Sequence, residues 1–300
     1  MTTALDRDFA LDDAPRPPAP VLTPHSIDEA LDLLAEEGAL AVGGGVGHML
    51  ARRSAGPPGV SAFISVRALP ELRAITWPDH GIRIGAGVRL SEIEADARLA
   101  AAWPALTAAA GSVATGRIRR MVTLGGNVCA HDDSHDPPVA LTALGAEMTV
   151  RSAGATRTLR VEQVAQLRPD ELVLDFRLAR PAARCGSAFE KFLVRGVWEY
   201  ACVNVAAVVG LDAAGAADRL SLAVGSVEGG PVPIDLSDLI GAAADRGLVE
   251  EAARRTAAAT RPYCDVRGSA AYKTLMIAEF TRRALAGAIR RAAPAEGDPR

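Results

Sequence analysis

Two glycine-rich segments about eighty residues apart constrain this chain more than any other feature of its sequence. The first reads Val42-Gly-Gly-Gly-Val-Gly47, and the second reads Thr123-Leu-Gly-Gly-Asn127. Glycine adopts positive φ angles without strain and lets backbone N–H groups approach an anion closely. The pair therefore predicts two turns that hold one diphosphate between them, as in a bound dinucleotide. The alternative is a strand-to-helix connection at the first segment and a β-turn at the second, both without a ligand.

Composition and charge narrow the class of protein. The chain has 300 residues, 49% of them hydrophobic and 23% charged, so two or three domains with a sizeable core can form. The net charge is −3 and no Lys/Arg block stands out, which argues against nucleic-acid binding. No apolar run reaches about eighteen residues and no signal-peptide pattern opens the chain. We expect a cytoplasmic protein without a membrane span.

The cysteines argue against a metal cluster carried by this chain. None of the four lies in a C-x-x-C pair, so we expect neither an iron–sulfur nor a zinc site and reduced thiols that pack in the fold. They are Cys129, Cys185, Cys202 and Cys264.

Helix and strand patterns alternate up to about residue 180. Ser26 can cap a first helix, and Leu72–Trp77 followed by Ile82–Ile84 has the signature of a hairpin. The other helices are expected at 91–96, 103–113 and 139–144, and the other strands at 40–42, 63–66, 146–151, 158–161 and 172–178.

The pattern becomes simpler after a boundary near Pro181–Gly186. Three strand-like runs at 188–194, 201–211 and 220–227 predict an antiparallel sheet. Two helices follow, near 248–259 and 269–290. We expect one apolar face of the last helix to consist of Tyr272, Leu275, Met276 and Phe280.

A polar loop, His131–Asp136, follows the second glycine turn. His131 and His135 with three aspartates could bind a metal, but converging ligands are needed and two prolines follow. A solvated loop beside a cofactor is therefore the favoured interpretation. Asp136 could cap the helix that begins at Pro137, bind a ligand, or do both. Arg117, Arg119 and Arg120 could attract a phosphate or a partner, or form a solvated basic face, and the three tryptophans (Trp77, Trp103 and Trp198) are expected to pack.

Six short motifs in order along the chain resemble one known family, the flavin-binding (medium) subunit of molybdenum hydroxylases. This group includes carbon monoxide dehydrogenase, xanthine dehydrogenase and bacterial aldehyde oxidoreductases, and the resemblance runs from about residue 24 to 290. The motifs are Leu69-Pro-Glu-Leu72, Gly81-Ile-Arg-Ile-Gly-Ala-Gly87, Thr123–Asn127, Asp136-Pro-Pro138, Phe189-Glu-Lys-Phe192 and Asp265-Val-Arg-Gly-Ser-Ala-Ala-Tyr272.

The resemblance implies an α+β fold. A PCMH-type, vanillyl-alcohol-oxidase-like FAD-binding domain is expected over 21–180, with subdomains at about 21–76 and 77–180. A C-terminal α+β domain with an antiparallel three-stranded sheet is expected over 185–291. Residues 1–20 would form a disordered arm and 292–300 a loose tail.

The resemblance also implies which residues bind FAD. The first turn would wrap the diphosphate with backbone donors, because its flanking valines offer no polar side chain; it comprises Val42, Gly43, Gly44, Gly45, Val46 and Gly47. The second turn would add backbone and side-chain groups from Thr123, Gly125, Gly126 and Asn127. Asp136 would accept hydrogen bonds from the adenosine ribose. Lys191 would lie near the isoalloxazine, although it could also be a surface lysine.

The implied function is an electron relay. FAD would receive electrons from a molybdopterin-containing large subunit through a 2Fe–2S small subunit and pass them to NAD, a quinone or oxygen. Gly81–Gly87 contains G-x-G but lies in a hairpin, so no nicotinamide motif identifies the acceptor. The alternative is a free-standing FAD-dependent oxidoreductase of specialised metabolism, with Lys191, His131, His135 and His48 as candidate catalytic groups. A scaffold that has lost FAD is the third hypothesis.

Overall fold

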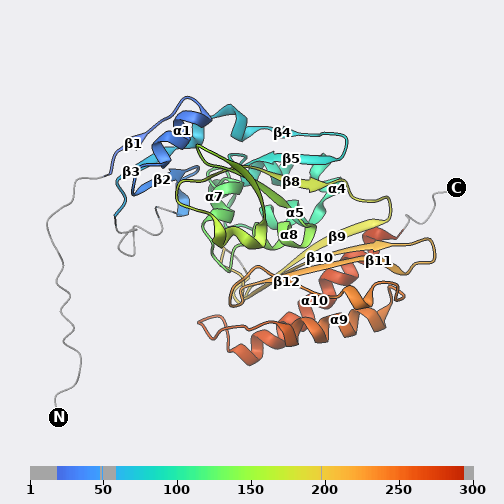
Figure 1. Cartoon of the computed structure of the whole chain (residues 1–300). Helices are drawn as coiled ribbons and strands as arrows, with labels where there is room; N and C mark the ends of the chain where they lie inside the picture. Colours follow the sequence, from blue (N-terminus) through green and yellow to red (C-terminus); the bar gives the residue numbers. More distant parts are fainter. Residues whose placement is uncertain (1–18, 48, 50–58, 197, 294–300) are drawn as a thin grey trace, which may run out of the picture.

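The computed structural model describes residues 19–47, 49, 59–196 and 198–293 (Figure 1). The expected arm at 1–20 lies almost wholly outside these residues, as do His48 and most of the expected tail at 292–300. The described chain forms three sheets that follow one another in sequence.

The first sheet is small and parallel, in the order β1-β3-β2. Its elements are β1 (Val21–Leu22), α1 (Ile27–Leu34), β2 (Ala39–Val42) and β3 (Ala62–Ser65). The Ser26 hydroxyl accepts a hydrogen bond from the Glu29 N–H at 3.1 Å, as the capping signal predicts. Strand β2 ends at Val42, so the sheet delivers the chain directly into the first glycine turn.

The second sheet is antiparallel, in the order β4-β5-β8-β6-β7. The predicted hairpin is confirmed, because Ile75 pairs with Ile84. The strands are β4 (Ile75–Thr76), β5 (Gly81–Gly85), β6 (Glu147–Arg151), β7 (Thr156–Arg160) and β8 (Leu172–Ala179), with short 3-10 helices at Val66–Ala68, Pro70–Arg73 and Val161–Gln166.

Six helices lie between β5 and β6 and supply much of the core. They are α3 (Leu90–Ala95), α4 (Ala97–Ala102), α5 (Pro104–Gly111), α6 (Gly116–Arg119), α7 (Leu124–Cys129) and α8 (Asp136–Leu144). The second glycine segment is not a β-turn but the first turn of α7, with Thr123 as its N-cap. Every residue of α8 is buried, because this helix lies between the second and third sheets (Figure 1).

The third sheet has four antiparallel strands, in the order β12-β11-β10-β9, so the expected three-stranded sheet was wrong by one strand. The missed strand contains Pro233 and lies at the edge, where a residue without an N–H is tolerated. The elements are β9 (Cys185–Phe192), β10 (Val203–Leu211), β11 (Ala217–Gly225), β12 (Val232–Ile234), a 3-10 helix at Ser237–Leu239, α9 (Arg246–Ala259) and α10 (Ala270–Ala292).

Two layers of helices enclose this third sheet. Helices α9 and α10 lie on one side of it, and α5 and α8 pack on the other (Figure 1). Strand β10 is therefore buried along its whole length. The face predicted for α10 was partly wrong, because Tyr272 and Leu275 are exposed whereas Lys273 and Ile277 are buried. Among the described residues, no helix combines the length and apolarity that crossing a membrane requires.

A buried lysine fastens the start of α10 to the preceding turn. Lys273 is fully buried, and its Nζ lies 3.0 Å from Asp265 Oδ1 and 4.3 Å from the centre of the Tyr263 ring. Arg267 binds the other carboxylate oxygen at 2.7 Å. Partial burial alone would raise the pKa of Asp265, but the hydrogen bonds from Arg267 and the nearby charge of Lys273 outweigh it and lower that pKa to about 2.

We expect Asp265→Asn to lower the free energy of unfolding at neutral pH. A depressed carboxyl pKa contributes stability that is fully present above the unfolded value of about 4 and is lost as pH falls towards the folded pKa. The gap between the wild type and the variant should therefore shrink as pH falls through this range, which urea denaturation measures. Asp238→Asn, at an exposed ion pair with Arg255, should have little effect at any pH. A gap independent of pH would contradict this account.

Candidate functional site

The structure brings the two glycine segments into direct contact. A Cβ atom on Gly44 would overlap the backbone carbonyl of Met121, and one on Gly43 would lie 2.5 Å from the Thr123 hydroxyl. Gly45 has φ of +75°, which favours glycine. The end of β2 therefore lies against the chain that enters α7, and only residues without side chains allow this approach.

Helix α7 presents a buried polar group that has no partner. Thr123 caps the helix by accepting the Gly126 N–H at 3.2 Å. Asn127 is 5% exposed, and its Oδ1 has no hydrogen-bond partner among the described residues. Leaving such an atom unpaired costs about 1–3 kcal/mol, so it indicates a ligand that donates a hydrogen bond.

Asp136 lies at the centre of a buried polar network. Asp136 is 2% exposed. Its Oδ2 accepts hydrogen bonds from Lys191 Nζ at 2.6 Å and from the Ser112 hydroxyl at 2.9 Å. Asn204 Nδ2 donates to Oδ1 at 2.9 Å. The N-cap of α8 is His135, and Asp136 is the first residue of the helix, so the structure does not support the alternative that Asp136 caps it. The network thus joins α5 and α8 to β9 and β10.

The polar loop at 131–136 bonds the C-terminal half of α7 through His135. His135 Nδ1 lies 2.8 Å from the backbone oxygen of Asn127, and its ring stacks on Tyr200 with centroids 6.2 Å apart. Burial, followed by the charge of Asp132, raises the pKa of the Tyr200 phenol. His131, in contrast, is exposed, and its charge acts on the neighbouring Asp133. Within that part of the chain, no group of three or more His, Cys, Asp or Glu could hold a metal ion.

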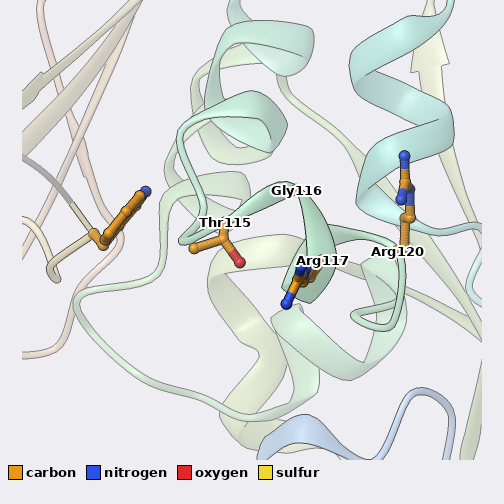
Figure 2. A pocket seen from close by; sticks show the side chains of 5 residues that line it. Thr115, Gly116, Arg117 and Arg120 are labelled. Atoms are coloured by element: carbon orange, nitrogen blue, oxygen red, sulfur yellow. The ribbon is translucent and has the colours of Figure 1, made fainter.

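A pocket of about 500 Å³ opens beside these elements. Its lining comes from the α6 turn on one side, where Figure 2 shows Thr115, Gly116 and Arg117 together with Arg120 at the end of the turn, and from Trp198 on the other. Arg119 binds Glu94 at 2.6 Å, whereas Arg117 and Arg120 have no ion pair among the described residues.

The tryptophans divide into two groups. Trp77 and Trp103 pack with ring centroids 5.8 Å apart, as predicted. Trp198 is 75% exposed, so the expectation that it packs was wrong. Its loop connects β9 with β10, and a local sequence pattern gave no sign that it would face α6. The sequence also did not predict that Ser112 and Asn204 belong to the site, because Asp136, which both of them bond, lies far from each in sequence.

The comparisons with known proteins agree with this geometry. Residues 16–179 match the family described as the FAD binding domain in molybdopterin dehydrogenase, and residues 187–288 match the CO dehydrogenase flavoprotein C-terminal domain. The chain belongs to this family of FAD-binding subunits, with FAD as its cofactor. It is thus a flavoprotein oxidoreductase subunit of the molybdenum hydroxylase type, as its motifs led us to expect.

Individual relatives cover nearly the whole chain. The 6-hydroxypseudooxynicotine dehydrogenase complex subunit alpha of Paenarthrobacter nicotinovorans is 29% identical, over 90% of this chain and 94% of the relative. The carbon monoxide dehydrogenase medium chain of Hydrogenophaga pseudoflava is 28% identical, over 90% and 96%. A solved structure of the dehydrogenase from that organism superposes with a TM-score of 0.85 at 26% identity and covers 92% of this chain and 99% of the matched chain.

We expect Gly44→Ala to separate the two glycine turns. The added methyl meets backbone atoms of Met121, which cannot rotate away, so we expect a loss of about 1–3 kcal/mol in stability and a loss of bound FAD. Gly154→Ala, in the turn between β6 and β7, is the matched control, since no described atom lies within 4 Å of the place that its Cβ would take. Flavin absorbance per mole of purified protein and thermal unfolding measure both effects. Equal flavin content in the two variants would contradict the contact.

Proposed function

We propose that this chain is the electron-relay subunit of a molybdenum hydroxylase-like dehydrogenase. A molybdopterin-containing large subunit would oxidise the substrate, and a 2Fe–2S small subunit would deliver the electrons. The names of the relatives support this, because one is a subunit of a dehydrogenase complex and another is a medium chain. Bound FAD would take up electrons singly and give them up in pairs to NAD, a quinone or oxygen. The complex would work in the cytoplasm.

The observation that carries this proposal is the contact between the glycine turns beside the unpaired Asn127 Oδ1. The backbone N–H groups of the first turn (Val42, Gly43, Gly44, Gly45, Val46 and Gly47) would hold the diphosphate. The second turn (Thr123, Gly125 and Gly126) would lie against it without donating from Gly125 or Gly126, because those N–H groups already bond the Ala86 carbonyl and the Thr123 hydroxyl. A hydroxyl or N–H of FAD would donate to Asn127 Oδ1. Asp136 accepts three hydrogen bonds of about four that a carboxylate can accept, so it retains capacity for one ribose hydroxyl.

We further propose that the isoalloxazine occupies the pocket between α6 and Trp198. The pocket wall at 115–120 leads directly into the second glycine turn, and about 500 Å³ is ample for a three-ring system. The exposed indole of Trp198 offers an aromatic face for stacking. Arg117 and Arg120 would place positive charge near the ring and favour its reduced, negatively charged form.

The proposal is tested by purification and reconstitution. The chain should purify yellow and should bind two further polypeptides that bring molybdenum and iron, measured by elemental analysis. Adding the partner subunits and their substrate should bleach the flavin absorbance. A yellow chain that turns over a small molecule alone, with oxygen uptake, would instead identify the free-standing oxidoreductase. A colourless chain that does not take up FAD would identify the scaffold.

We expect Asn127→Ala to weaken FAD binding by about 1–3 kcal/mol, which is about 5- to 150-fold in Kd, because it removes an acceptor matched to the cofactor. Thr142→Val is the matched control. Thr142 is also buried and its hydroxyl also lacks a partner among the described residues, but it lies further along α8, away from the turns. Fluorescence titration of the apoprotein with FAD measures both. Equal affinities in the two variants would contradict the role of Asn127.

A further inference from the structure

We infer that Lys191 is a positioning residue that couples the seating of the C-terminal sheet to the FAD site through Asp136. The inference rests on the proposed function and specifies how two parts of the chain build one cofactor site. It differs from direct contact between Lys191 and the isoalloxazine, which the motif around this lysine led us to expect.

Lys191 bonds two residues on the other side of the C-terminal sheet's packing interface. Its Nζ donates to Asp136 Oδ2 at 2.6 Å and to the backbone oxygen of Ser112 at 3.2 Å. The side chains of Lys191 and Asp136 are only 9% and 3% exposed. An ammonium has three N–H donors, so two are already used inside the protein. Lys191 therefore binds the end of α5 and the start of α8, which are the helices on the FAD side of the sheet.

Both partners of Lys191 lie close in sequence to residues of the proposed FAD site. Ser112 is three residues before Thr115, which lines the pocket. Asp136 follows His135, which binds the backbone oxygen of Asn127 at the end of the second glycine turn. Asn204 strengthens the same route, because its Nδ2 also donates to the His135 carbonyl at 3.3 Å. Both the pocket wall and the glycine turn are thus one or two contacts from Lys191.

Lys191 also lies close to the loop between β9 and β10, which carries the other wall of the pocket. Lys191 pairs with Asn204 across β9 and β10, at the base of the loop that carries Trp198 and Tyr200. Tyr200 stacks on His135, and Ser226, directly after β11, donates its backbone N–H to the backbone oxygen of Asp133 at 2.6 Å. The network therefore fixes the distance between the two walls of the pocket, since each wall is anchored beside it.

The energetics make this coupling strong. Removing one partner of a buried ion pair leaves an uncompensated charge, which is far more costly than losing an exposed pair. A side chain that orders both walls also lowers the ordering cost of FAD binding. Coupling of this kind is reciprocal, so bound FAD should in turn tighten the docking of the sheet.

The experiment compares the only two lysines of the chain, Lys191 and Lys273, in the full-length protein. Both are buried in the C-terminal part and both pair with an aspartate, but the ammonium of Lys273 lies against Asp265 and Tyr263 instead of the FAD-side helices. We expect Lys191→Met to raise the Kd for FAD about tenfold or more and to increase hydrogen exchange over 112–119 and 124–136. The absorption spectrum and midpoint potential of the FAD that still binds should stay as in the wild type. Lys273→Met should leave the Kd within about twofold, and Lys191→Arg should restore part of the affinity.

Other outcomes decide against the inference. A shifted spectrum or potential in Lys191→Met, with unchanged Kd and exchange, would establish direct contact with the flavin instead. If Lys191→Met and Lys273→Met changed the Kd and the hydrogen exchange equally, Lys191 would contribute only to the overall stability of the fold. If Lys191→Met does not fold, Ser112→Ala removes one bond to Asp136 and should still raise the Kd several-fold. If the wild type binds no FAD, the proposed function fails, while the exchange data on the apoprotein still judge the network.

Discussion

The approach of two backbone segments is the constraint on which the rest of this structure depends. Gly44 lies against the carbonyl of Met121, so a parallel strand pair and the start of α7 can meet only where side chains are absent. This contact connects the small first sheet with the helices that sit on the second. Under the proposed function, the backbone N–H groups of the first turn would bind the diphosphate at this contact.

The sequence predicts those parts of the fold that follow from local chemistry. Ser26 and Ser269 cap their helices, since each hydroxyl finds a backbone N–H three residues later. The hairpin at 75–84 and the three long C-terminal strands are also confirmed, because alternation and turn residues are visible within short windows. The two glycine segments meet, as their composition predicts, whereas their binding of the diphosphate stays a prediction. The family motifs around them identify the cofactor.

Other parts depend on contacts between distant residues and could not be predicted in this way. Strand β12 carries a proline that normally argues against a strand, and only its place at the edge makes it tolerable. The buried face of α10 is shifted because Lys273 turns inward to meet Asp265. Ser112 and Asn204 have no individual signature, since their roles depend on Asp136, which lies 24 and 68 residues away.

Under the proposed function, the polar network would explain how a first turn without polar side chains binds FAD. Val42 and Val46 offer no side-chain donors, so binding there would rely on backbone N–H groups held in one geometry. Backbone donors bind an anion well only when they are already oriented, because ordering them on binding costs free energy. The Asp136–Lys191 pair and His135 hold the neighbouring turn and pocket wall before the ligand arrives. Rigidity supplied by the C-terminal sheet would thus compensate for the polar side chains that the first turn lacks.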